Sequence, residues 1–183
     1  MSSTARLAAN DVPLLNGRSL FVLAEMWKDI CPSRSRVEWH KLIWFFGHVP
    51  RASFICWLAL LDRLTTTDML KKWGHLVTDG CCCFCQMEEE NRSHLSFTCS
   101  FTKSIWEKIR NILFLAGPTG DWDKEYNEAL EWKGKKLETI IKKLAWTVYI
   151  YIVWSERNVR IFQGRAKSAE VLTCSEDFVQ FFY

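Results

Sequence analysis

The sequence lacks any apolar run long enough to cross a membrane. Its most apolar stretch, Ala145–Trp154, falls well short of the roughly 20 residues that a membrane-spanning helix needs. The opening segment Met1–Gly17 is mixed in polarity and has no continuous apolar core, so we expect no export leader. These absences predict an intracellular protein, nuclear or cytoplasmic, that is not secreted and has no membrane partner.

The sequence also lacks the alternation of apolar and polar residues that marks a strand, and it has no internal repeat or low-complexity segment. Apolar residues recur instead at the helical period. This pattern predicts helices over Leu20–Ile30, Val37–Phe46, Pro50–Leu61, Thr65–Gly74, Thr102–Leu115 and Leu137–Phe162, with a further helix possible within Gly164–Tyr183. Proline is favoured in the first turn of a helix, which fits a helix that begins at Pro50. This helix is more apolar than the preceding one, and we expect it to be the most buried. Thr65, with Asp68 three residues on, is the predicted N-cap of its helix.

Net charge is low, because 24 Lys and Arg stand against 21 Asp and Glu, which leaves +3. Such a balance neither requires nor excludes a polyanionic partner, so clustering of charge matters more than the total. The segment from Lys133 to Lys167 contains nine basic and two acidic residues, an excess of seven positive charges. That segment is the strongest electrostatic candidate for contact with phosphates, and a solvated helix face is the alternative.

Cysteine, by contrast, is abundant, with eight residues. Four residues form a C-x2-C-x8-H-x4-C array: Cys82, Cys85, His94 and Cys99. Three thiolates and one imidazole fill the tetrahedral shell of one Zn²⁺ and leave no position for a reactive water, so the metal is predicted to be structural. A reducing compartment also favours metal binding over disulfides. A cysteine-rich loop without metal and a disulfide cluster are the alternatives.

Spacing selects Cys82 as the partner of Cys85, because two intervening residues let both sulfurs of a turn face one ion. Cys81 would leave three intervening residues and Cys83 one, and both spacings fit a tight zinc knuckle less well. The acidic run Glu88–Glu90 inside the loop is predicted to be a solvated loop tip rather than a magnesium site.

These patterns predict a mainly α fold, with a small helical domain that carries one zinc-knuckle-like loop and is followed by a long C-terminal helix. The run Gly117-Pro118-Thr119-Gly120 is the clearest break in the chain. We therefore expect a flexible N-terminal segment at 1–18, the zinc-binding domain at 19–116, a linker at 117–134 and a C-terminal helical segment at 135–183.

Many residues around the array agree in order and spacing with a known family. They are Trp44, Val49-Pro50-Arg51, Phe54, Trp57, Arg63-Leu64-Thr65-Thr66, Leu70, Cys82, Cys85, Glu90, His94-Leu95, Phe97, Cys99 and Trp106. This run resembles the reverse-transcriptase zinc-binding domain, which plant non-LTR (LINE-type) retroelements carry downstream of the polymerase. A later set is similar to the segment that commonly follows that domain: Tyr151, Trp154, Glu156-Arg157-Asn158 and Arg160-Ile161-Phe162.

The resemblance implies an accessory role in nucleic-acid handling rather than catalysis. The chain has no Tyr-x-Asp-Asp signature, no nucleophile with an evident base and no phosphate-cradling glycine loop. Asp121 and Asp123 flank Trp122 in a turn-like stretch without identifiable partner carboxylates. We therefore expect no enzyme activity and no small-molecule substrate.

The main functional hypothesis is a zinc-binding, non-catalytic nucleic-acid-binding module derived from a retroelement reverse transcriptase. RNA or DNA would be its partner, with phosphates contacted by basic residues such as Lys71, Lys72, Arg92 and Lys103 and with an exposed aromatic side chain stacked on an unpaired base. The first alternative is a scaffold module that docks onto a reverse transcriptase or another protein. The second is a retroelement relic that folds around zinc without a selected function.

Overall fold

The computed structural model describes residues 14–15, 18–19, 37–75 and 80–174. Contacts divide the chain into two compact units, Met1–Val37 and Glu38–Tyr183. In the first unit, strand β1 (Leu14–Leu15) pairs antiparallel with β2 (Arg18–Ser19), with Leu14 opposite Ser19. The helix predicted at Leu20–Ile30 lies outside the described residues, as does most of the predicted flexible segment 1–18.

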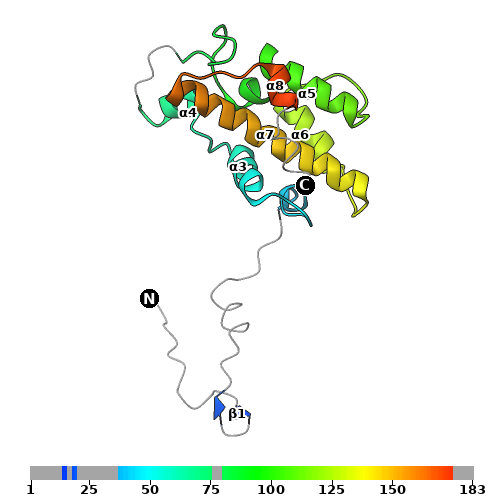
Figure 1. The fold of residues 1–183 in the computed structure, drawn as a ribbon. Helices are drawn as coiled ribbons and strands as arrows, with labels where there is room; N and C mark the ends of the chain where they lie inside the picture. The colour runs from blue at the N-terminus through cyan, green and yellow to red at the C-terminus, as the bar shows by residue number, and fades with distance from the viewer. Residues whose placement is uncertain (1–13, 16–17, 20–36, 76–79, 175–183) are drawn as a thin grey trace. The chain divides into compact units, whose positions relative to one another are not determined.

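The second unit is helical, which confirms the predicted fold class (Figure 1). Its elements are α2 (His40–Ile43), α3 (Pro50–Leu60), α4 (Thr67–Lys72), the π-helical turn η1 (His94–Thr98), α5 (Ser100–Ile112), α6 (Trp122–Leu130), α7 (Leu137–Gln163) and α8 (Ala169–Cys174). The long C-terminal helix is thus confirmed within one residue of its predicted end. Among these described helices, none combines the length and apolarity that crossing a membrane requires.

Helix α7 is the central element, because it contacts α2, α3, α5 and η1 (Figure 1). The prediction that the Pro50 helix would be the most buried is wrong, because four of the 11 residues of α3 are buried against 13 of the 27 residues of α7. Helix α3 buries its small residues Ala52, Ser53, Cys56 and Ala59, which lets its backbone approach α7 closely. Its bulky Phe54 stays 50% exposed.

Aromatic side chains fill the core between α7, η1, α5 and α6. Tyr149 on α7 lies 4.7 Å from Trp106 and 5.6 Å from Phe97, measured between ring centroids. Its hydroxyl donates to the backbone carbonyls of Ser96 and Thr102. A buried tyrosine needs such a partner for its hydroxyl, so this residue ties α7 to both η1 and α5.

Helix α4 begins one residue later than predicted. Thr66 rather than Thr65 is its N-cap, and the Thr66 hydroxyl donates to the Asp68 carboxylate instead of accepting from the helix. The helix ends as a Schellman motif, in which the N–H of Gly74 donates to Lys71 O and that of His75 to Leu70 O. Gly74 has φ +81°, a conformation that glycine adopts without steric cost.

The segment predicted as a linker, 117–134, contains helix α6, which is fixed to α5 by a buried ion pair. Arg110 Nη1 lies 2.8 Å from Glu125 Oε2, and both side chains are at most 3% exposed. The indole N–H of Trp106 and the backbone N–H of Gly120 also donate to the Glu125 carboxylate. The polar run around Asp121 is the start of a packed helix, in which the Asp121 side chain accepts from the N–H of Lys124.

A second buried ion pair joins α7 to the loop that carries the cysteines. Glu90 is 0% exposed and its Oε1 lies 2.7 Å from Arg157 Nη2. The same carboxylate oxygen accepts from the N–H of Thr67 at the start of α4, while Arg157 also donates to Thr65 O. The predicted solvated acidic tip is therefore wrong at Glu90, because a guanidinium and a helix N-terminus neutralise a carboxylate that would otherwise be costly to bury.

Arg157→Met is expected to lower the free energy of unfolding by about 3–5 kcal/mol, because it leaves the Glu90 charge buried without its partner. Urea unfolding followed by circular dichroism measures this loss. Lys133→Met, which removes an exposed pair with Glu131, is the matched control and should change stability by less than about 1 kcal/mol. Equal losses in the two variants would contradict the structural importance of the buried pair.

Candidate metal centre

The first two ligands lie on a tight hairpin. The N–H of Cys82 donates to Glu88 O, and Cys82 O accepts from the N–H of Gln86, at 2.7 and 2.8 Å. Residues 81 and 89 form the bridge that closes this hairpin. The chain between Cys82 and Cys85 therefore turns back on itself, as a C-x2-C knuckle requires.

The other two ligands lie at the ends of one π-helical turn. In η1 the N–H of Cys99 donates to His94 O at 2.9 Å, which is the i→i+5 bond of a π-helix. The side-chain amide oxygen of Asn91 accepts from the N–H of His94 and fixes the start of the turn. The H-x4-C spacing of the sequence is thus one π turn, which brings Cys99 back to the side of the chain on which His94 lies.

The four predicted ligands meet at one point. One donor atom from each of Cys82, Cys85, His94 and Cys99 lies within 4.8 Å of the others. Cys82 Sγ is 3.9 Å from Cys99 Sγ, and Cys85 Sγ is 3.3 Å from His94 Nε2. Tetrahedral Zn²⁺ with Zn–S near 2.3 Å and Zn–N near 2.0 Å has S–S and S–N separations of about 3.8 and 3.5 Å, so these residues fit a zinc ion.

Electrostatics at the centre favour a thiolate at Cys99. The Cys82 thiol donates to Cys99 Sγ, which lowers the pKa of Cys99 and raises that of Cys82. Burial opposes the shift at Cys99, while the backbone N–H groups of Phe101 and Thr102, at the start of α5, reinforce it. Burial and the nearby Glu90 charge also raise the pKa of Cys83, to about 12.

Glu88 determines which histidine nitrogen faces the cluster. Its Oε2 lies 3.2 Å from His94 Nδ1, on the side of the ring away from the Cys85 sulfur. A carboxylate that accepts from one ring nitrogen leaves the other as the metal donor and orients the ring. His94 Nε2 is therefore the donor atom of this centre.

Helix α7 also covers the tip of the knuckle. The Arg160 guanidinium lies 4.8 Å from the Phe84 ring and 4.4 Å from the Phe101 ring, and these rings stack at 5.0 Å. Arg160 also pairs with Glu156, one helical turn earlier on α7, with its Nε 2.8 Å from Glu156 Oε1. The knuckle, the start of α5 and the C-terminal part of α7 thus form one packed unit.

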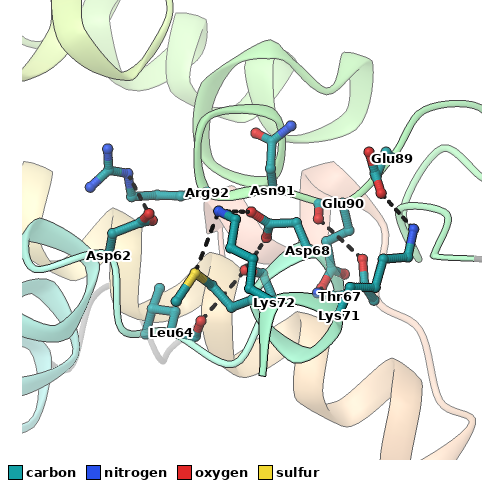
Figure 2. Close-up of polar contacts among 12 residues, drawn as sticks. Asp62, Leu64, Thr67, Asp68, Lys71, Lys72, Glu89, Glu90, Asn91 and Arg92 are labelled. Carbon is teal, nitrogen blue, oxygen red and sulfur yellow. Dashed lines mark hydrogen bonds and ion pairs between the residues drawn. The ribbon is translucent and has the colours of Figure 1, made fainter. Parts of the chain in front are cut away.

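The basic residues predicted to contact nucleic acid are each paired with a carboxylate. Figure 2 shows Lys71 with Glu89, Lys72 with Asp68 and Arg92 with Asp62, at 2.5, 3.1 and 3.5 Å. Lys103 lies 4.0 Å from Glu107. Arg92 is further held by Ala59 O and by the Trp122 ring. The assignment of these four residues to nucleic acid stays a prediction.

Sequence reasoning missed the residues that support the ligands. Glu88 and Glu90 were not distinguished within one acidic run, although Glu90 is buried and Glu88 faces His94. The basic segment Lys133–Lys167 is only partly solvated, because Lys143 and Arg157 are 5% and 3% exposed. Arg157 and Arg160 belong to the segment that resembles the one following the domain, but that resemblance did not indicate that they contact Glu90, Phe84 and Phe101.

Cys82→Ser is expected to remove bound zinc and to lower the melting temperature, because a three-ligand site loses most of an apparent binding free energy of about 10–16 kcal/mol. Metal analysis of protein purified without added zinc, with thermal melts before and after a strong chelator, measures both effects. Cys81→Ser is the control and should keep the zinc content of the unaltered chain. Retention of zinc by Cys82→Ser, or its loss from Cys81→Ser, would contradict the ligand assignment.

Glu88→Gln is expected to weaken zinc binding about tenfold. The glutamine amide can still orient the His94 ring, but it lacks the negative charge of Glu88, which makes the His94 ring a stronger ligand for the metal. Competition with a chromophoric chelator measures the affinity. Glu89→Gln, on the adjacent exposed residue, is the control and should leave the affinity unchanged. The same affinity for Glu88→Gln and the unaltered chain would show that Glu88 does not support the site.

No curated protein and no solved structure matches the chain. A family model does match part of it, the one described as zinc-binding in reverse transcriptase, over residues 21–106. The matched segment includes all four residues of the metal cluster. In this part the chain is similar to the zinc-binding domain of reverse transcriptases.

Proposed function

We propose that this protein is a zinc-stabilised, non-catalytic nucleic-acid-binding module that assists a retroelement reverse transcriptase. The observation that carries the proposal is the Cys3His cluster inside the segment that matches the reverse-transcriptase zinc-binding family. The residues that resemble plant non-LTR elements extend the proposal to that class of retroelement. An intracellular location, nuclear or cytoplasmic, and a polymerase partner go with this role.

The chemistry of the ligands supports a structural metal. Three cysteines and one histidine complete a tetrahedral zinc shell, whereas a hydrolytic zinc needs an open position for water. Bound zinc would supply rigidity, since it joins the knuckle to η1 through pairs of side chains 17 and 9 positions apart in the sequence. The module would then present a preformed surface to its nucleic acid.

The exposed cations around the knuckle can exchange their partners for phosphate. Lys71, Lys72 and Lys103 have side chains that are 42–58% exposed, and surface ion pairs of this kind are worth about 0–1 kcal/mol. A phosphate replaces such a carboxylate at little cost. Arg92 is less available, because its side chain is 24% exposed and also binds a backbone carbonyl.

Docking onto another protein is the second candidate function. The C-terminal part of α7 exposes Ile161 and Phe162, at 43% and 76%, and α8 exposes Val171 at 49%. Exposed apolar side chains of this kind occur at protein interfaces. This candidate shares the structural zinc with the main proposal and differs in its partner.

The zinc-loaded chain is expected to bind single-stranded oligonucleotides in a salt-dependent way, since each phosphate contact contributes about −0.7 to the slope of log affinity against log salt. Fluorescence anisotropy with labelled RNA and DNA measures this slope. The triple variant Lys71→Gln, Lys72→Gln, Lys103→Gln should flatten it by about two. Absence of binding at low salt, or binding independent of salt, would contradict the proposed function.

A further inference from the structure

The segment around α2 and α3 differs in charge from the rest of the protein. From Trp39 to Leu61 the sequence has no Asp or Glu, and this is its longest acid-free stretch. Lys41 and Arg51 are exposed within it. Among the described residues, neither cation lies within 4.0 Å of a carboxylate, in contrast to the paired Lys71, Lys72 and Lys103.

Residues 41–54 run from α2 through the connecting loop into α3, and we call this segment the α2–α3 corner. The Ser53 hydroxyl donates to Ile43 O at 2.9 Å and so joins α3 to the end of α2. In the connecting loop, His48 Nδ1 lies 2.8 Å from Phe45 O, and the His48 ring is 5.4 Å from the Trp44 ring. The loop is therefore held by its own contacts.

The corner exposes aromatic rings beside its cations. Phe46 is 91% exposed, Phe54 50% and Trp44 37%. Burial of a large aromatic side chain in a protein core is favourable, yet these three side chains remain at the surface within one short segment. Arg51 and Phe54 are three residues apart on α3, so they lie on the same face of that helix.

A further cation lies beneath the corner. Lys143 on α7 donates from Nζ to Lys41 O at 3.0 Å. Burial, together with the charge of Lys41, lowers the pKa of Lys143. A nearby anion would relieve this repulsion between like charges, and no acidic side chain of the corner itself supplies one.

We propose that the α2–α3 corner binds single-stranded nucleic acid, with Phe46 and Phe54 stacked on unpaired bases and Lys41 and Arg51 on the flanking phosphates. Exposed aromatic rings interleaved with cations are the common means of binding single strands, because every base offers a face for stacking. A duplex hides those faces, so it binds this surface more weakly. The inference rests on the proposed function and assigns it a contact surface separate from the lysines near the zinc knuckle.

The test uses the full zinc-loaded chain with fluorescein-labelled U20 RNA, dT20 DNA and a 20-base-pair DNA duplex, and measures anisotropy over a range of salt. Phe46→Ala is compared with Phe114→Ala, a residue that is 93% exposed at the end of α5. Arg51→Gln is compared with Lys108→Gln, which removes one charge from α5. Zinc content and melting temperature are measured for every variant, and Phe54→Ala repeats the aromatic test on a second ring.

Phe46→Ala should weaken binding of the single strands about fivefold or more, since stacking is worth about 1–3 kcal/mol per base and 1.4 kcal/mol is tenfold. Arg51→Gln should flatten the salt slope by about 0.7. Phe114→Ala and Lys108→Gln should keep the affinity of the unaltered chain within about twofold. The RNA and DNA arms report which single strand is preferred.

Other outcomes overturn the inference, and they separate it from the proposed function. If the unaltered chain binds single strands but Phe46→Ala and Arg51→Gln match their controls, the contact surface lies elsewhere and the proposed function stands. If the unaltered chain binds no oligonucleotide at low salt, the proposed function fails as well. If Phe46→Ala instead dissociates a dimer without changing oligonucleotide affinity, the corner is an interface between copies of the chain.

Discussion

The buried ion pair between Glu90 and Arg157 is the interaction on which the metal loop, α4 and α7 all depend. Glu90 makes its 2.7 Å contact with the guanidinium through its side chain. Its backbone N–H donates to Gly80 O, and its carbonyl oxygen accepts from the N–H of Asp68. One residue thus closes the loop, caps a helix and joins the loop to the central helix. Since a buried charge is tolerated only when its partners are complete, loss of Arg157 would weaken all three features.

The zinc knuckle is therefore not an independent module within the protein. Its cysteines are positioned by a short hairpin and a π turn, but the hairpin is held in place from outside by Arg157 and Arg160 on α7. A metal held by the four ligands would stabilise the same segment that the ion pair stabilises through Glu90. The family match ends at residue 106, whereas the structural unit that supports the ligands extends through α7.

The sequence allowed prediction of those features that depend on local pattern. The helical period of apolar residues predicted α7. The ligand spacing predicted the four residues of the cluster, because a knuckle and a single helical turn are each formed by residues close together in the sequence. Features that depend on distant partners were not predictable. Glu90 and Arg157 are 67 positions apart, and nothing near Glu90 distinguishes it from Glu88 and Glu89. Likewise, α3 was expected to be the most buried helix. It buries its small residues and leaves the bulky Phe54 half exposed.

The distance in sequence between the two halves of the ion pair also imposes an order on folding. A ribosome releases Cys82, Cys85, His94 and Cys99 well before Arg157, which follows Glu90 by 67 residues. Since chains begin to fold from the N-terminus during synthesis, the four metal donors are available while Glu90 is still solvated and α7 is unmade. A zinc ion bound by these donors would therefore hold the loop in an unfinished chain, and the arrival of α7 would then make that loop part of the core.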